Sequence, residues 1–162
     1  QNEKFAAHLG AFLSGNSMKA KNRLRAITKR NRGVNVRKVM QEIKVYMTGW
    51  LNYYGIASLK TKMREWDEWL RHRIRANIWK QWKKPKTKRK NLMKLGVPEY
   101  YAHMAANSRR GYWFTVNTGA VTRGITKERL TRAGFFELSP AYESIQTACI
   151  GRAVYRTVRT VR

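Results

Sequence analysis

Residues 79–92, WKQWKKPKTKRKNL, place two tryptophans among seven lysines and arginines. Ammonium and guanidinium groups bind phosphate oxygens, and the planar arginine fork can bond two oxygens at once. Aromatic rings can stack on unpaired nucleobases. These residue types therefore support binding to a polyanion, through a disordered basic tail, a solvated helix face or a fixed surface.

The rest of the chain also carries a large excess of positive charge. Its 162 residues include 35 Lys and Arg against 9 Asp and Glu, a formal net charge of +26. Self-repulsion at this charge opposes compaction, so we expect a polyanionic partner to offset it. Nucleic acid is the first candidate because each neutralised phosphate releases counterions. An anionic membrane surface is the second.

Groups that could perform catalysis or hold a metal ion are few. Asp67 is the only aspartate, and it lies beside Glu65 and Glu68. Carboxylates so close along one predicted helix cannot converge on a pair of metal ions, so we interpret them as helix-end charge and ion pairs. The three histidines are far apart, and the single Cys149 allows no intrachain disulfide or paired-cysteine zinc motif. We therefore predict no catalytic residue, metal site or cofactor in this chain.

Three amphipathic helices are expected to support the basic residues. Apolar residues recur at spacings of three and four over residues 17–31, 35–54 and 60–83, which predicts a small helical bundle. Ser17 is the expected N-cap of the first helix, and a close helix–helix contact is expected at Gly49. The buried faces are expected to include Ala20, Leu24, Ile27, Val39, Ile43, Trp50, Leu70, Ile74 and Ile78.

Shorter segments flank the predicted bundle. Residues 1–16 are expected to be the last strand or turn of a preceding segment, or a linker. Residues 109–119 are expected to be extended, and residues 146–162 form a basic tail without an assignment. Pro85 ends the third helix or lies just past its end. Short helices are expected over residues 86–95, 98–108 and 125–133.

The sequence shows no sign of export or membrane insertion. No apolar run approaches the roughly 20 residues of a membrane span. The first residues, QNEKFAAHLG, lack the basic and long apolar regions of a signal peptide. These features predict a cytoplasmic protein. Because the chain lacks an initiator Met, we expect it to be a piece of a longer one.

The aromatic residues divide into expected core and candidate stacking positions. Helical spacing favours burial of Trp50, Tyr54 and Trp66. Trp69 and Trp79 lie off the apolar face of the third helix, so they either pack against a second layer or stack on nucleobases. Tyr112 is a further candidate for stacking.

The candidate phosphate contacts are the basic residues of the first and third helices, the turns after them and one later pair. They are Arg23, Arg25, Lys29, Arg30, Arg32, Arg64, Arg71, Arg75, Lys80, Lys83, Lys84, Lys86, Lys88, Arg89, Lys90, Arg109 and Arg110. Any one of these could be a solvated charge, but solubility alone does not require the whole set.

Several segments, in this order, resemble the maturase region of group II intron reverse transcriptases, most of all the bacterial group IIC branch. The resemblance covers roughly residues 17–145, and its most specific part is the WLRxRIR…WKQWK block. The matching segments are GWLNYY (49–54), EWLRHRIRANIWKQWKKPKT (68–87), LMKLGV (92–97), ANSRRGYWFTVNTGAVT (106–122) and LTRAGF (130–135).

The resemblance implies a mainly α fold, with a three-helix thumb bundle (17–84) followed by a smaller, irregular α-rich maturase extension (85–145). It implies that the fragment binds group II intron RNA to assist splicing. In the full-length protein the fragment would clamp the RNA–DNA template–primer, or target DNA, during target-primed reverse transcription.

The parent protein would be an RNA-directed DNA polymerase whose fingers and palm lie upstream of this chain. Mg²⁺ is expected for that polymerase and for the intron ribozyme, whereas the fragment alone is not expected to be an enzyme. A general basic protein, ribosomal or DNA-binding, stays open as an alternative, as does a protein of anionic membrane surfaces.

Overall fold

The computed structural model describes residues 2–55 and 57–148, and within these ranges every regular element is helical. The mainly α prediction is therefore confirmed. The elements are α1 (Asn2–Ile27), the short 3-10 helix η1 (Arg30–Arg32), α2 (Val36–Tyr54), α3 (Lys60–Gln81), α4 (Pro85–Lys94), α5 (Glu99–Ala106), α6 (Tyr112–Thr115), α7 (Gly119–Gly124) and α8 (Lys127–Arg132). Residues 138–148 form one more helix.

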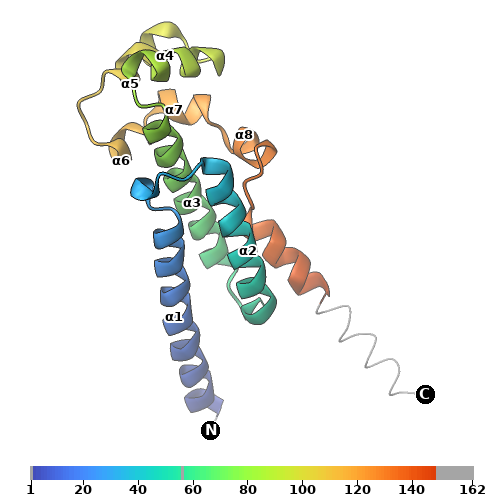
Figure 1. The fold of residues 1–162 in the computed structure, drawn as a ribbon. Helices are drawn as coiled ribbons and strands as arrows, with labels where there is room; N and C mark the ends of the chain where they lie inside the picture. The colour runs from blue at the N-terminus through green and yellow to red at the C-terminus, as the bar shows by residue number, and fades with distance from the viewer. Residues whose placement is uncertain (1, 56, 149–162) are drawn as a thin grey trace.

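The first three α-helices form the predicted bundle, running up, down and up (Figure 1). Their apolar faces meet because residues three and four apart share one side of a helix. The predicted core positions are buried, with Ile78 alone among them only partly so. Asn35 caps α2 by accepting a hydrogen bond from the backbone N–H of Arg37.

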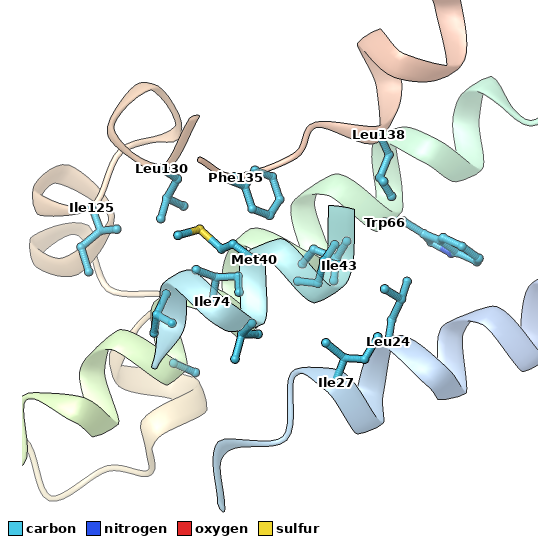
Figure 2. Packing of buried hydrophobic residues seen from close by; sticks show 14 of the residues in the cluster. Leu24, Ile27, Met40, Ile43, Trp66, Ile74, Ile125, Leu130, Phe135 and Leu138 are labelled. Carbon is cyan, nitrogen blue, oxygen red and sulfur yellow. The ribbon is translucent and has the colours of Figure 1, made fainter. Parts of the chain in front are cut away.

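The later segments extend this core instead of building a separate one. Figure 2 shows Ile125, Leu130, Phe135 and Leu138 beside the buried side chains of α2 and α3. All four belong to the same apolar cluster as Ile74. The bundle and the chain that follows it therefore share one continuous hydrophobic core.

Helices α4 and α5 pack as a hairpin beyond the end of α3 (Figure 1). Pro85 occupies the first turn of α4, where its missing N–H breaks no helical hydrogen bond. Gly96 adopts a φ of 81°, which lets the chain turn sharply towards α5. Helix α7 packs against α4 at Gly124, where a Cβ would lie 2.9 Å from Cδ2 of Leu92.

A buried carboxylate joins α3 to the last described helix. Asp67 is 3% exposed, and its oxygens accept hydrogen bonds from the backbone N–H groups of Leu138 (2.7 Å) and Ser139 (2.9 Å). The Ser139 hydroxyl also donates to Asp67, at 2.7 Å. These amides begin helix 138–148 and have no partner within it, so Asp67 acts as its cap. The interpretation of Asp67 as an ion-pairing, helix-end charge was therefore wrong.

The turn between α2 and α3 is bonded to the same helix. The Tyr142 hydroxyl donates to the carbonyl of Ala57 (2.7 Å) and accepts from the N–H of Leu59 (3.1 Å). The Gln146 amide donates to the carbonyl of Gly55. Helix 138–148 therefore bridges both ends of the turn and the middle of α3.

Three local predictions were wrong at the start of the chain and in α2. Residues 2–16 are helical, not a strand or turn, because Gly15 lies exposed in α1 and a single glycine costs a helix only about 1 kcal/mol. Ser17 is consequently a buried residue inside α1, with its hydroxyl accepting from Lys62 Nζ (3.0 Å), and is not an N-cap. Gly49 is exposed, and nothing would lie within 4 Å of an added Cβ there.

The segment 109–119, expected to be extended, contains α6 instead. The buried Thr115 hydroxyl bonds to the carbonyls of Arg110 and Gly111, both at 3.2 Å, and so stabilises a single helical turn. Such side chain to backbone bonds leave little trace in a pattern of apolar residues. The tail from residue 149 onwards lies outside the described residues. Among the described helices, none combines the length and hydrophobicity needed to span a membrane.

Replacing Asp67 by Asn is expected to lower the free energy of unfolding by about 1–3 kcal/mol. One amide oxygen cannot replace two charged acceptors, and a backbone N–H would lose its partner. Urea unfolding followed by circular dichroism measures the change. Glu68→Gln, at an exposed position one residue later, is the matched control. Equal stability of the two variants would show that the cap does not hold the helix.

Candidate nucleic-acid interface

A basic hollow lies where the end of α1 meets the middle of α3. Its volume is about 270 Å³, and no carboxylate is among the residues that line it. Arg30 and Lys29 come from the turn after α1, Arg73 from α3 and Trp113 from α6. Side chains from three separate segments therefore surround one positively charged space.

Arg73 is held in this hollow by hydrogen bonds and a ring contact. Its Nε donates to the Thr28 hydroxyl at 2.5 Å, and its Nη2 donates to the carbonyl of Arg25 at 3.1 Å. The guanidinium also lies 5.1 Å from the ring centre of Trp69. These contacts fix the side chain while leaving it without an ion pair to any described carboxylate.

Burial and neighbouring cations make a positive charge energetically less favourable at Arg73 and at Arg75. Partial burial lowers the pKa of Arg73, and the nearby charges of Arg25 and Arg30 lower that pKa further. Burial likewise lowers the pKa of Arg75, with Arg71 adding to the effect. Arginine stays charged at any physiological pH, so a bound anion would favour the charged state of these side chains.

Trp113 lines both this hollow and a second depression, whose other lining residues come mostly from α3. The ring of His72 stacks on the Trp113 ring with 3.6 Å between ring centres, and His72 Nε2 lies 3.0 Å from the Trp113 carbonyl. Burial lowers the pKa of His72, the bond to Trp113 opposes that shift, and Arg75 and Arg73 reinforce it. The imidazole is therefore mostly neutral at pH 7.

Tyr112 connects the hollow to the basic run on α4. Arg30 lies 5.2 Å from the centre of its ring, and the ammonium of Lys88 lies 5.1 Å from the same centre. Lys88 is itself only 8% exposed and lies 5.0 Å from the ring of Trp79. A ring–cation series thus extends from η1 through α6 to α4.

The other charges of residues 79–92 face solvent, except that of Lys80, which is half-buried and bonds to Asn31. Lys83, Lys84, Lys86 and Lys90 are exposed, and Arg89 is exposed while paired with Glu99 at 2.6 Å. Four residues of this run, with His103 and Asn107 of the α5 side, line a groove of about 630 Å³. The basic residues therefore project from the end of α3 and from α4. They form a fixed surface and not a disordered tail.

The predicted contact residues fall into two groups. The first group is exposed to solvent and comprises Arg23, Lys29, Arg64 and Arg109, together with Lys83, Lys84, Lys86 and Lys90. The others also bond within the protein: Arg25 to Asn22, Arg32 to Glu42 and the Ile27 carbonyl, Arg75 to the Ile125 carbonyl, Lys80 to Asn31, and Arg110 to the ring of Phe114. Arg71 is half-buried.

The three candidate stacking residues have different surroundings. Trp79 is buried in the core, so the packing alternative holds for it and its ring is not open to a nucleobase. Trp69 is half-buried against the core and lies near Lys21 and Arg73. Tyr112 keeps 38% of its surface exposed, although two cations already contact its ring.

Sequence reasoning missed Arg73, His72 and Trp113 as members of the site. A signal for Arg73 existed, because Trp69 and Arg73 are four residues apart and share one face of a helix. Trp113 carried no such signal, since its segment was expected to be extended. Within the described residues, no group of three or more His, Cys, Asp or Glu side chains could hold a metal ion.

Comparison with known families identifies the part of the chain that carries most of this surface. Residues 17–96 match the family model described as Group II intron, maturase-specific domain. The match confirms the resemblance over these residues, whereas its continuation to residue 145 stays a prediction. No curated protein matches the chain.

Acidification is expected to weaken the fold through His72. Because its folded-state pKa is lowered, the unfolded chain binds the proton first, and stability falls as pH drops through about 6.5. Urea midpoints at about pH 7.5 and about pH 5.5 measure this while staying above the ordinary carboxyl range. His72→Gln should remove most of the difference, and His103→Gln, at an exposed position, should keep it. An unchanged pH dependence in His72→Gln would refute the assignment.

Neutralising the exposed part of the basic run is expected to weaken RNA binding without loss of the fold. Changing Lys83, Lys84, Lys86, Arg89 and Lys90 to Gln should lower affinity roughly tenfold or more. The salt dependence should become shallower by about one unit per lost phosphate contact. Filter binding at several salt concentrations measures both quantities, and a circular-dichroism melt checks folding.

Lys88→Gln is the matched control on the same helix. Because the Lys88 ammonium lies buried against two rings, this change should leave the salt slope unaltered. If Lys88→Gln reduced the salt slope as much as a Gln substitution at one exposed neighbour does, the distinction between the buried Lys88 and the exposed charges of α4 would be wrong.

Proposed function

Because residues 17–96 belong to the group II intron maturase-specific family, we propose that this chain binds group II intron RNA and assists its splicing. The proposal rests on one observation. The matched region contains most residues of the Arg73 hollow and the basic residues of α4. Of the residues that line the hollow, only Trp113 lies outside the match.

The electrostatics of the hollow favour a phosphate-bearing partner. Arg30 lies close enough to Arg73 to lower the pKa of Arg73, and no described carboxylate forms an ion pair with Arg73. A phosphate group would accept hydrogen bonds from both guanidiniums and remove the repulsion. Without an anionic partner, the charge of Arg73 would be offset only by its hydrogen bonds to Thr28 and to the Arg25 carbonyl.

Such a surface is better suited to binding an RNA helix than to reading the base sequence of DNA. Double-stranded RNA is recognised largely by its shape, through contacts to phosphate and the 2′-hydroxyl. Cations spread over α1, η1, α3 and α4 can follow a folded backbone without reading bases. In this proposal the chain stabilises the active RNA conformation, and the ribozyme performs the cleavage and ligation.

The same surface would have a second task in a longer protein. We propose that it clamps the RNA–DNA template–primer or the target DNA, next to fingers and a palm that carry the polymerase activity. Mg²⁺ would serve that polymerase and the ribozyme. Binding to nucleic acid in general, without preference for an intron, is the alternative that the following experiment addresses.

Affinity for an intron RNA should exceed affinity for a scrambled RNA of equal length at the same salt concentration. The double change Lys29→Gln and Arg30→Gln should lower intron affinity about tenfold, as expected for loss of charge-assisted contacts. Arg37→Gln with Lys38→Gln, an exposed pair of equal charge on α2, should lower it less. Electrophoretic mobility shifts measure all three.

Equal affinities for intron and scrambled RNA would contradict the maturase proposal and favour a general basic protein. Equal losses in the two double variants would instead show that the hollow is not a preferred contact. A melting curve for each variant separates either result from unfolding.

A further inference from the structure

An aromatic groove is lined by residues of α5, α6 and α7 and of the segments that join them. Figure 1 shows these three helices near the C-terminal end of α3. The volume of the groove is about 710 Å³, within the roughly 300–1,000 Å³ of ordinary ligand sites. Tyr100 and Tyr101 of α5 and Phe114 of α6 line it with 68%, 50% and 50% of their surfaces exposed. Large apolar groups gathered on an open surface indicate an interaction site.

Cations and hydroxyl groups lie among the apolar residues of the lining. The guanidinium of Arg110 lies 4.2 Å from the centre of the Phe114 ring, and Arg123 of α7 also lines the groove. The lining contains no carboxylate, while Ser108, Thr115 and Thr118 supply hydroxyl oxygens. The groove therefore complements a ligand that combines flat π surfaces with negative charge.

The rings are held by packed elements and not by loose loops. Ala102 and Ala105 of α5 are buried in the core, and Ala105 also lines the groove. Phe114 precedes Thr115, whose buried hydroxyl bonds to the backbone of residues 110 and 111. Stacking on these rings would thus require little additional ordering.

We propose that this groove binds a single-stranded segment of RNA. Its unpaired bases would stack on Tyr101 and Phe114, and its phosphates would meet Arg110 and Arg123. A duplex cannot use the groove in this way because its base faces are already stacked on one another. An apolar protein partner would cover both guanidiniums without supplying a counter-charge, which is unfavourable.

This site is distinct from the basic hollow and does not rest on the maturase proposal. None of the residues that line the groove lines the Arg73 hollow, and all of them follow the matched residues 17–96. Failure of either proposal therefore leaves the other standing.

The test uses the whole chain and a single-stranded RNA of about 12 nucleotides with a central 2-aminopurine, within the usual site size. Measurement at about 0.3 M salt screens the exposed charges elsewhere on the surface. Tyr101→Leu with Phe114→Leu keeps apolar groups but removes the rings. Affinity should fall about tenfold and stacking-dependent quenching should disappear, with less than twofold change for a hairpin duplex.

Tyr53→Leu, which removes a still more exposed ring (73%) from the far end of α2, is the control and should bind like the unchanged protein. Arg110→Gln, which keeps both rings, should weaken binding about threefold, and it tests the site even where the double variant melts early. The proposal is overturned by unchanged single-strand affinity in the folded ring variants. Equal loss for the duplex, or tighter binding of DNA of the same sequence, would also overturn it.

Discussion

A single buried carboxylate determines how the two halves of the chain meet. Asp67 sits inside α3, where its charge would be costly without partners, and three donors from Leu138 and Ser139 satisfy it. Those donors begin the helix that also bonds to the α2–α3 turn through Tyr142. With that helix fixed, residues 125–138 are held over α2 and α3, and the shared core closes.

A rigid support changes what the excess positive charge can do. Exposed lysines on a flexible tail would bind any polyanion with a large loss of conformational freedom. Here the cations project from helices, and some are aligned further by rings, as Arg73 is by Trp69 and Arg30 by Tyr112. Preorganised charges lose less entropy on binding, so shape can contribute to selectivity.

The sequence predicted those features that depend on periodic patterns. The faces of α2 and α3, with Ile43, Leu70 and Ile74, followed directly from the helical spacing of apolar residues. It could not show which cations are satisfied internally, because the partners of Arg75 and Lys88 lie far along the chain or are rings of other elements. The roles of Asp67 and Trp113 likewise depend on contacts across many residues, which no local pattern encodes.

The long sequence separation between Asp67 and its partners has a kinetic consequence. Contacts 71 and 72 residues apart form only after a large loop closes, and such closure slows folding compared with local helix pairing. During synthesis α1, α2 and α3 emerge before residues 138–148. A nascent chain would therefore carry most of its basic surface before its fold is locked, and a polyanion already present could guide the final step of assembly.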